Sequence, residues 1–393
     1  MLTNRKTRKR PLTQWSKSAL AGCDWFVNSQ VVQQQPNWDA NHGRFMYNVH
    51  VPTGTSCRGI GWTQARAVMC LLAGYERTGD KRFMEAAERG IAYAKNLQNM
   101  DRRFPQTYGA FHEETPFSPF SYPRDAIEVA EALLQWHLVT GDEDALYRAE
   151  LFLQWFKRQA LTVYPRFGTW VEGSVRFDNK KPAPHFRRPV SCQMGCVTIL
   201  CHAYETTGKP WHKTTALKIA DTTVGNYLPE GKGPLSNPAR HRAGRHTAGD
   251  AIIYNDDGGA VGLLNAYKVS GKQKYLDAAV QAAEFFRSFD GAIPIFGGVG
   301  SVANFLLEAD RILGGTRYRK VAERLVRQTL KLQVNSGRKS ARGGFRGEDE
   351  GGKWYVKGSR NRDFVTTRVT AYSVLALFKF EGVAWPRGYS TRW

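Results

Sequence analysis

The chain has 393 residues, of which 42% are hydrophobic, so it is long enough to bury a large core. No apolar run is long enough to cross a bilayer, and the basic residues 5–10 are followed by an amphipathic segment, not by the apolar core of a signal peptide. The net charge of +21 fits a nucleic acid, an acidic substrate such as a polyuronate, or a solvated basic surface without a ligand, but the sequence has no helix-turn-helix, zinc-finger or RNP motif. We therefore expect no nucleic acid and no membrane as partners, a flexible basic N-terminus over residues 1–11, and a cytoplasmic protein, or a secreted one if a leader is missing.

The first predicted helices show how the chain is organised. Residues 13–32 form an amphipathic helix, and residues 62–75 are apolar on almost every side, which predicts a helix buried on every side. Thr78-Gly79-Asp80 ends that helix, because glycine adopts the left-handed conformation after a helix and aspartate caps the next one. Residues 81–98 then carry a single apolar stripe. A buried helix followed by a half-exposed one predicts a hairpin with one inner and one outer helix.

The same hairpin recurs along the chain. Further apolar helices are predicted at 123–140, 189–207, 258–270, 299–313 and 362–380, and amphipathic ones at 143–160, 211–227, 273–289 and 316–334. The last apolar helix has no outer partner after it, and the first helix of the chain supplies one. An open solenoid would need a regular repeat length and polar caps, so we predict one all-α domain over residues 1–393, a closed (α/α)6 toroid of six helical hairpins.

The loops predict where the functional site lies. Every turn from an inner to an outer helix has two or three residues, whereas most return connections are long. The long loops must then share one rim, at the N-terminal ends of the inner helices, and long loops in a compact domain are usually functional. The predicted funnel is built from residues 33–60, 101–122, 162–188, 229–257 and 335–361.

The cysteines give no sign of a cofactor or a metal. Most of the six lie inside predicted helices, where cysteine packs as a small apolar residue. Cys192, Cys196, Cys201 and His202 are candidates for a zinc site, but the chain has no CxxC pair. We expect core packing there, with no metal and no cofactor.

Hairpins, Thr-Gly-Asp turns and one-sided loops make the chain resemble the six-hairpin glycosidase superfamily over nearly its whole length. Gly61-Trp62-Thr63 is similar to the start of an inner helix in unsaturated glucuronyl hydrolases, and residues 113–119 are similar to an acidic loop of glucuronyl C5-epimerases. The resemblance implies a glycoside hydrolase, a polysaccharide lyase or an epimerase. Together with the positive charge, it implies an acidic, uronate-containing poly- or oligosaccharide as the partner.

Hydrolysis needs two carboxyl groups, one protonated and one ionised, on either side of the glycosidic bond. Asp256 and Asp257 precede an inner helix on the predicted rim, where one of them can instead be its N-cap. Glu113 and Glu114 are candidates on a facing loop. Asp125, which can also pair with Arg124 or cap its helix, and Glu172 are further candidates.

A lyase or C5-epimerase needs a base and a cation that neutralises the uronate carboxylate. The eligible bases are His112, His185, His246, Tyr122 and Tyr254, and the eligible cations are Arg124, Arg188 and Arg245. The simpler interpretation of each rim histidine is a hydrogen bond that holds a loop. The arginines and histidines favour this class, whereas the paired carboxylates favour hydrolysis.

Our first hypothesis is hydrolysis of an acidic glycan. It assigns Asp257 with Glu113 or Glu114 as the carboxyl groups, and three aromatic residues as platforms for sugar rings: Trp62, Tyr122 and Trp170. Arginines suit substrate carboxylates because they bind them bidentately, and we assign this role to Arg58, Arg124, Arg188 and Arg245. The alternatives are a lyase or C5-epimerase on the same substrates, and a non-catalytic protein that binds a polyanion.

Overall fold

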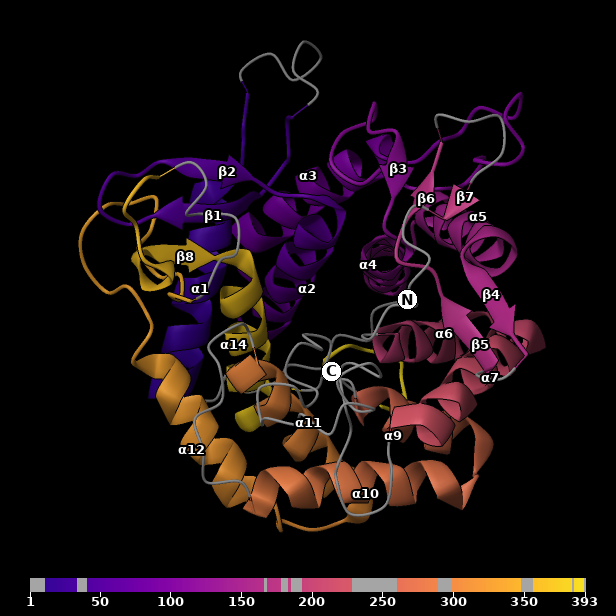
Figure 1. Cartoon of the computed structure of the whole chain (residues 1–393). Coiled ribbons are helices and arrows are strands. Elements are labelled where there is room, and N and C mark those ends of the chain that lie inside the picture. Colours follow the sequence, from indigo (N-terminus) through magenta and orange to yellow (C-terminus); the bar gives the residue numbers. More distant parts are fainter. Residues whose placement is uncertain are drawn as a thin grey trace.

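Helices in the described part of the chain form two concentric rings in the computed structural model (Figure 1), which describes residues 11–33, 41–165, 168–177, 183–184, 193–227, 260–288, 298–347, 356–383 and 385–391. The inner ring consists of α2 (Gly61–Thr78), α4 (Pro123–Thr140), α6 (Met194–Thr207), α9 (Ala260–Ser270), α11 (Gly298–Leu313) and α14 (Thr367–Phe380). The outer ring consists of α1 (Gln14–Ser29), α3 (Lys81–Asn96), α5 (Glu143–Gln159), α7 (Pro210–Tyr227), α10 (Gln273–Ser288) and α12 (Arg319–Leu330).

The inner ring is closed. Each inner helix packs against the next in the order α2, α4, α6, α9, α11 and α14, and α14 packs against α2 again. The first helix, α1, packs against the last inner helix, α14, and so completes the sixth hairpin. The predicted (α/α)6 toroid and the closing role of the first helix are confirmed.

Short glycine turns set the hairpin geometry. Gly79 and Gly141 end α2 and α4 with φ of 73° and 80°, in the left-handed region that costs glycine little. The next residues, Asp80 and Asp142, cap the outer helices by accepting from the backbone N–H groups of Arg82 (3.0 Å) and Ala145 (3.1 Å). Because these turns join inner to outer helices at one end of the barrel, the long return connections start α2 and α4 from the other end.

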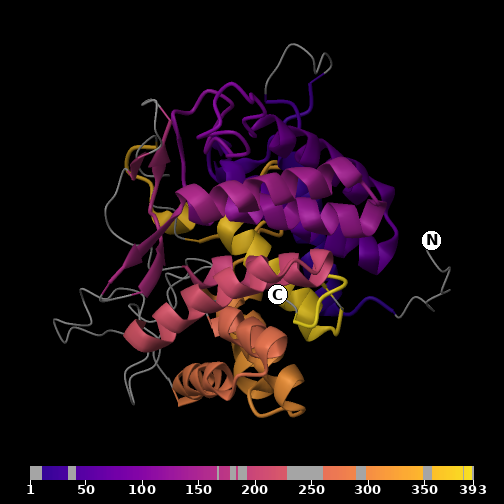
Figure 2. The same cartoon turned by 90° about the vertical axis from the view of Figure 1, so that its right-hand side faces the viewer.

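Small antiparallel sheets tie the return connections together at that other end. β1 (Met46–His50) pairs with both β2 (Ser56–Arg58) and β8 (Phe364–Thr366), which joins the loop before α2 to the segment before α14. β3 (Phe120–Ser121), β6 (Val175–Arg176) and β7 (Ala183–Pro184) form a second sheet, and β4 (Leu161–Tyr164) pairs with β5 (Gly168–Val171). Figure 2 shows the magenta strands at one end of the helices, on the side that faces the viewer in Figure 1. The sequence predicted loops where β1 to β7 lie, and a helix where β8 lies.

Several predicted helices were too long. The prediction of a helix over 362–380 was wrong at its start, because the β-favouring residues Phe364–Thr366 pair with β1 and Thr366 caps α14 through the N–H of Val369 (3.2 Å). The helix predicted over 316–334 begins at Arg319 and ends at Leu330, since Gln333 pairs with Phe345. The first helix ends at Ser29, before the predicted Val32.

Close contact between α11 and α14 depends on Gly300. A Cβ atom at this position would lie 2.6 Å from the backbone carbonyl carbon of Tyr372. Replacing Gly300 by alanine should lower the free energy of unfolding by about 1–3 kcal/mol, although alanine is the better helix former. Urea unfolding of the wild type and the variant would measure this loss of stability. Gly315 is the matched control, because a Cβ there meets nothing within 4 Å; equal losses for the two alanine variants would contradict the proposed steric cause.

In the described residues, no helix is both long and apolar enough to cross a membrane. The described cysteines are free thiols, and Cys196 and Cys201 are fully buried in α6, as expected for core packing; Cys192 lies outside the described residues.

Candidate active site

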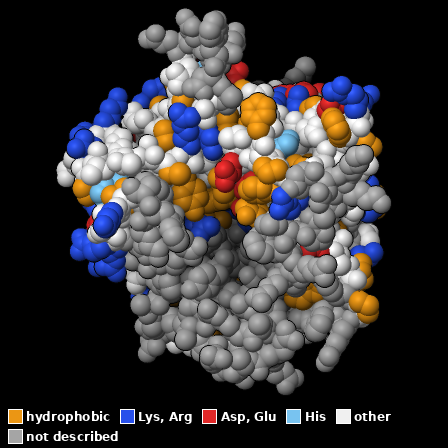
Figure 3. All heavy atoms as spheres, turned by 45° about the horizontal axis from the view of Figure 1, so that its top comes forward, with side chains coloured by type: hydrophobic (Ala, Val, Ile, Leu, Met, Phe, Trp, Pro, Cys, Tyr) orange, Lys and Arg blue, Asp and Glu red, His pale blue; other side chains and the backbone are white. Residues whose placement is uncertain are grey.

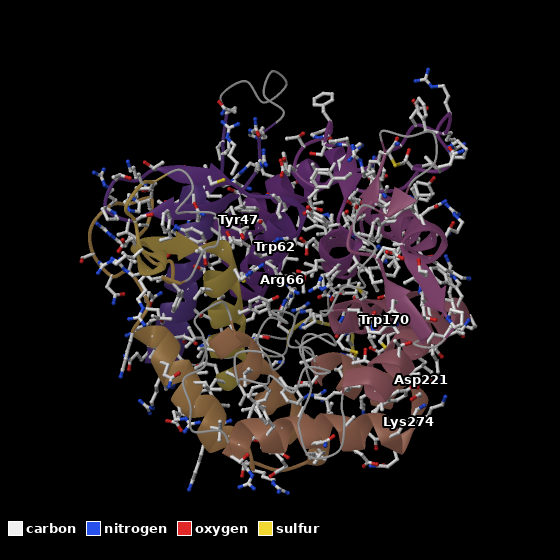
Figure 4. All side chains as sticks on the ribbon, viewed as in Figure 1. Tyr47, Trp62, Arg66, Trp170, Asp221 and Lys274 are labelled. Atoms are coloured by element: carbon white, nitrogen blue, oxygen red, sulfur yellow. The ribbon has the colours of Figure 1, made fainter. Side chains whose placement is uncertain are left out.

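Three neighbouring inner helices, α14, α2 and α4, each contribute two side chains that are four residues, or one helical turn, apart, and these side chains make contacts between the helices. These pairs are Arg368 and Tyr372 on α14, Trp62 and Arg66 on α2, and Arg124 and Glu128 on α4. Because the helices run in the same direction from the rim, the pairs form an upper layer and a lower layer. Figure 4 places Trp62 and Arg66 on α2, toward the centre of the ring of helices.

The lower layer is a buried ion-pair cluster. The Glu128 carboxylate contacts the guanidinium group of Arg66, and it accepts a hydrogen bond of 2.6 Å from Arg124 Nη2. Burial alone would raise the pKa of Glu128, but the two arginines hold it below its ordinary value, so Glu128 is ionised. Arg66 also lies over the ring of Tyr372, with Cζ 5.1 Å from the ring centroid. Two cations thus share one carboxylate in the interior.

The upper layer surrounds Trp62. The guanidinium carbon of Arg368 lies 5.2 Å from its ring centroid, and Tyr47 from β1 meets it edge to face at 5.8 Å. Trp62 is only 6% exposed, so little of its ring is open to a ligand. A ligand in the barrel would therefore meet the arginine and tyrosine side chains as well as the tryptophan that the sequence suggested.

The clearest candidate for proton transfer is a pair of carboxyl groups, Glu113 and Asp125. Glu113 is 2% exposed, whereas Asp125, in the first turn of α4, is half-buried. Burial raises the pKa of Glu113 well above its ordinary value, and the nearby charge of Asp125 and a hydrogen bond with its side chain raise it further. The surroundings therefore favour the protonated form of Glu113, and the two carboxyl groups are placed to share a proton.

Backbone contacts fix Glu113 beside the start of two inner helices. Its carbonyl oxygen accepts from Gly61 N (2.8 Å) at the start of α2, and its N–H donates to the carbonyl of Phe120 (3.1 Å) in β3. Its side-chain Oε2 accepts from the backbone N–H of Tyr122 (3.0 Å), the residue that precedes α4. The loop is thus bound to α2, β3 and α4, and the carboxyl pair lies at the rim end of the barrel.

The other predicted residues of this loop have different surroundings. Glu114 is exposed. His112 Nδ1 lies 2.6 Å from the carbonyl oxygen of Ser118, its ring contacts Phe177, and burial lowers its pKa, which suits the simpler role of holding the loop. Tyr122 is half-buried beside Phe120, and burial followed by the charge of Glu113 raises the pKa of its hydroxyl.

The third loop supplies Trp170 and Glu172, at the end of β5. Both are almost fully buried, at 3% and 2% exposed, and the Glu172 carboxylate accepts a hydrogen bond from the hydroxyl of Thr162. Figure 4 shows Trp170 near α6, apart from Trp62 on α2. Arg58, in β2, is exposed.

Several predicted site residues fall outside the described residues, and their predictions stay as the sequence made them. They are His185, Arg188, Arg245, His246, Tyr254, Asp256 and Asp257.

Sequence reasoning missed three charged residues of the barrel interior: Arg66, Glu128 and Arg368. A signal for the first was present, since Arg66 is the one charged residue between Trp62 and Tyr75 of a helix that otherwise reads as apolar. A charged residue in such a helix needs a partner in the interior. The sequence does not say which helix supplies that partner.

The surface of the rim fits a candidate site at this end of the barrel. In an oblique view the rim is hollowed, and acidic side chains lie between hydrophobic ones at the described edge of the hollow (Figure 3). Among the described residues, no group of three or more His, Cys, Asp or Glu side chains is placed to hold a metal ion.

Solved structures of known proteins share this architecture. An α-1,6-mannanase of Salegentibacter sp. HEL1_6 is 15% identical with a TM-score of 0.64, covering 95% of this chain and 100% of its own. An unsaturated glucuronyl hydrolase specific for heparin is 15% identical with a TM-score of 0.66, covering 94% of this chain and 97% of its own. A sugar epimerase from a ruminal bacterium is 10% identical to this chain with a TM-score of 0.66, and the match covers 93% of this chain and 98% of the epimerase.

The chain has the six-hairpin glycosidase fold. At these identities the likeness concerns the fold alone, and no protein-family model and no curated protein matches the sequence. Within the six-hairpin fold, the Glu113–Asp125 pair and the two layers of side chains are features of this chain's own residues. They are the basis of the proposed function.

Proposed function

We propose that the protein is a carbohydrate-active enzyme that hydrolyses glycosidic bonds of an acidic, uronate-containing poly- or oligosaccharide. The observation that carries this proposal is the carboxyl pair of Glu113 and Asp125 at the rim end of the barrel, where burial and the neighbouring carboxyl group favour the protonated form of Glu113. A carboxyl group that stays protonated at neutral pH is what a glycosidase needs as its general acid.

In this proposal the pair delivers its proton through Asp125, the more exposed of the two groups. The proton goes to the glycosidic oxygen as the bond from that oxygen to the anomeric carbon breaks. Water adds to the anomeric carbon and loses a proton to a second carboxylate, which we assign to Asp257. Glu113 acts through Asp125 and is a positioning residue.

The charge of the barrel interior supports an acidic substrate. The four charged side chains of the two layers, Arg66, Arg124, Arg368 and Glu128, have a net charge of +2, from three cations and one anion. The N-terminal ends of the inner helices face the same space and also favour negative charge. A uronate carboxylate entering from the rim would be attracted by both, and Arg368 and Arg124, in the upper layer, would meet it first.

Two of the structural neighbours support parts of the proposal. A variant of the mannanase in which two consecutive aspartates are replaced by alanine is inactive and was solved with a bound mannotetraose. This chain has the consecutive pair Asp256-Asp257, three residues before α9. The glucuronyl hydrolase is specific for heparin, which is an acidic glycan.

The test is a screen of acidic polysaccharides and their oligosaccharides that follows new reducing ends and ultraviolet absorbance of a C4=C5 uronate double bond together. Reducing ends without new absorbance would support hydrolysis. Both signals rising together would replace hydrolysis by elimination, with the arginines as neutralising groups. No change in either signal on any substrate would contradict the proposal.

Replacing Asp257 by asparagine should abolish turnover without unfolding the protein, because the amide cannot accept the proton of the attacking water. The measurement is the rate of reducing-end release, together with the thermal unfolding midpoint. The exposed Asp277 on α10 provides the matched control, since Asp277→Asn makes the same chemical change away from the rim. Full activity of Asp257→Asn would remove this residue from the mechanism.

A further inference from the structure

A groove of about 490 Å³ lies on the outer wall of the barrel, outside the site described above. It is formed by the last turn of α6, one face of α7 and the turn between α9 and α10. Its lining residues are Tyr204, Pro210, Lys213, Thr214, Leu217, Lys218, Asp221 and Lys272. Because the turns from inner to outer helices lie at the end of the barrel opposite the rim, the groove opens away from the candidate active site.

Figure 4 shows the same separation. Asp221 and Lys274 lie close together near α7 and one end of α10, whereas Tyr47, Trp62 and Arg66 lie near β1 and α2. A ligand in the groove would therefore occupy a different face of the molecule from a ligand in the barrel.

Among the described residues that line the groove, the one carboxylate, Asp221, is already neutralised. Asp221 Oδ1 lies 2.6 Å from Lys274 Nζ and accepts a hydrogen bond of 2.6 Å from the hydroxyl of Tyr275. Burial alone would raise the pKa of Asp221, but these two partners and the charge of Lys272 hold it below its ordinary value. The carboxylate is thus ionised and fixed on α7.

Three lysines supply an excess of positive charge. Lys213, Lys218 and Lys272 line the groove, and within the part of the chain that the structure describes no carboxylate lies within 4.0 Å of their ammonium groups. Lys213 and Lys218 belong to one face of α7, and Lys272 faces them from the α9–α10 turn. An anionic ligand between these elements would be held from two sides.

The rest of the lining suits a sugar ring. Tyr204 is half-buried, and Lys213 Nζ lies 5.5 Å from its ring centroid, which places an ammonium group beside an aromatic ring. Pro210 and Leu217 add apolar surface. A sugar has apolar C–H faces that pack on such surfaces, and the carboxylate or sulfate groups of an acidic sugar would reach the lysines.

We propose that this groove is a second, non-catalytic binding site for a chain of acidic sugars. The inference rests on the proposed function, because it takes the same class of glycan as the ligand. In this role the groove holds one part of a long polymer on the outer wall while another part occupies the rim, so that binding at the two places raises the apparent affinity for polymers over short substrates.

The experiment compares two charge-reversed variants of the full chain. In Lys213→Glu/Lys218→Glu the groove loses its cations on α7, and Lys320→Glu/Arg324→Glu makes the same change of net charge on the exposed face of α12. Calorimetry measures binding of a defined oligogalacturonide, which carries only carboxylates, and of a heparin oligosaccharide, which also carries sulfates. Thermal unfolding midpoints check that both variants are folded, and the neutral variant Lys213→Ala/Lys218→Ala replaces the first if it does not fold.

We expect the groove variant to bind the glycan that fits about tenfold more weakly than the α12 variant does, with a difference that shrinks at high salt. Preference for one of the two oligosaccharides identifies the anionic group. The rate on the shortest substrate that is cleaved should be the same in both variants, while KM for the polymer should rise only in the groove variant. Equal affinity in the wild type and the groove variant, or equal loss in both variants, would overturn the proposal. Because calorimetry detects binding whether or not the glycan is cleaved, the binding comparison can still be interpreted if the hydrolysis screen finds no substrate.

Discussion

Replacing Glu128 by alanine should lower the free energy of unfolding by about 3–5 kcal/mol, the range for breaking a buried ion pair by removing one partner. The Glu128 side chain is 5% exposed, and it contacts Arg66 and Arg124, whose side chains are 2% and 5% exposed. Without the carboxylate, two cations would remain close together in the barrel interior with no anion between them. The measurement is the urea unfolding midpoint and slope at neutral pH.

An exposed ion pair provides the control. Glu323 on α12 contacts Arg327 at 2.5 Å, but their side chains are 37% and 61% exposed. Replacing Glu323 by alanine should change stability by about 1 kcal/mol or less, because water and salt screen the pair. A similar small effect for Glu128→Ala would show that the two arginines do not depend on this carboxylate, and the proposed anion-binding character of the barrel would lose its structural basis.

The repeat and its turns could be predicted because their determinants are local. Gly79, Gly141, Gly208 and Gly271 each follow an apolar helix and adopt positive φ, so the turn chemistry is legible within a few residues of sequence. The inner helices α4 and α11 begin within one residue of their predicted starts. Closure of the ring could be predicted by counting inner and outer helices, since the last inner helix needed an outer partner and only the first helix was left to supply it.

The small sheets of the rim could not be predicted in the same way. β1 at residues 46–50 pairs with β8 at residues 364–366, and no local pattern relates strands so far apart in the sequence. Each strand is also short, so its alternation of side chains is too brief to distinguish from a loop. The start of α14 was misplaced for this reason.

The candidate site was predictable as a region but not as a set of contacts. The acidic loop at residues 113–119 and the start of α4 were both predicted to face the funnel, yet the sequence left Asp125 with three possible roles. Only the fold brings Asp125 against Glu113, twelve residues earlier, by binding the loop to Gly61 and Phe120. The pairing of Arg66 on α2 with Glu128 on α4 depends on the packing of two helices and has no sequence signature.

Replacing Asp125 by asparagine should lower kcat by about 10²–10⁴-fold, the usual contribution of a general acid or base. The amide keeps the size of the side chain but cannot donate the shared proton to a leaving oxygen. Glu114→Gln is the control on the neighbouring loop, because Glu114 is exposed and lies next to Glu113 in the sequence. Steady-state kinetics on the best substrate of the screen would separate the two variants, and equal losses would argue against Asp125 as the proton donor.

The pH dependence of stability tests the shared proton without a substrate. The folded pKa of Glu113 is raised above its unfolded value of about 4.3, so the folded state holds a proton that the unfolded state releases. The stability that depends on this proton is fully present below about pH 4.3 and is lost as the pH rises toward the folded pKa. Glutamine resembles the protonated form at every pH.

The free energy of unfolding of Glu113→Gln should therefore fall less steeply than that of the wild type as the pH rises above about 4.3. Urea unfolding of both proteins at a series of pH values measures the difference, in which the contributions of the other titrating groups largely cancel. Parallel curves would mean that Glu113 titrates alike in the folded and unfolded chains. Glu113 would then be ionised beside Asp125 at neutral pH, and the pair could not supply the proton that the proposed hydrolysis requires.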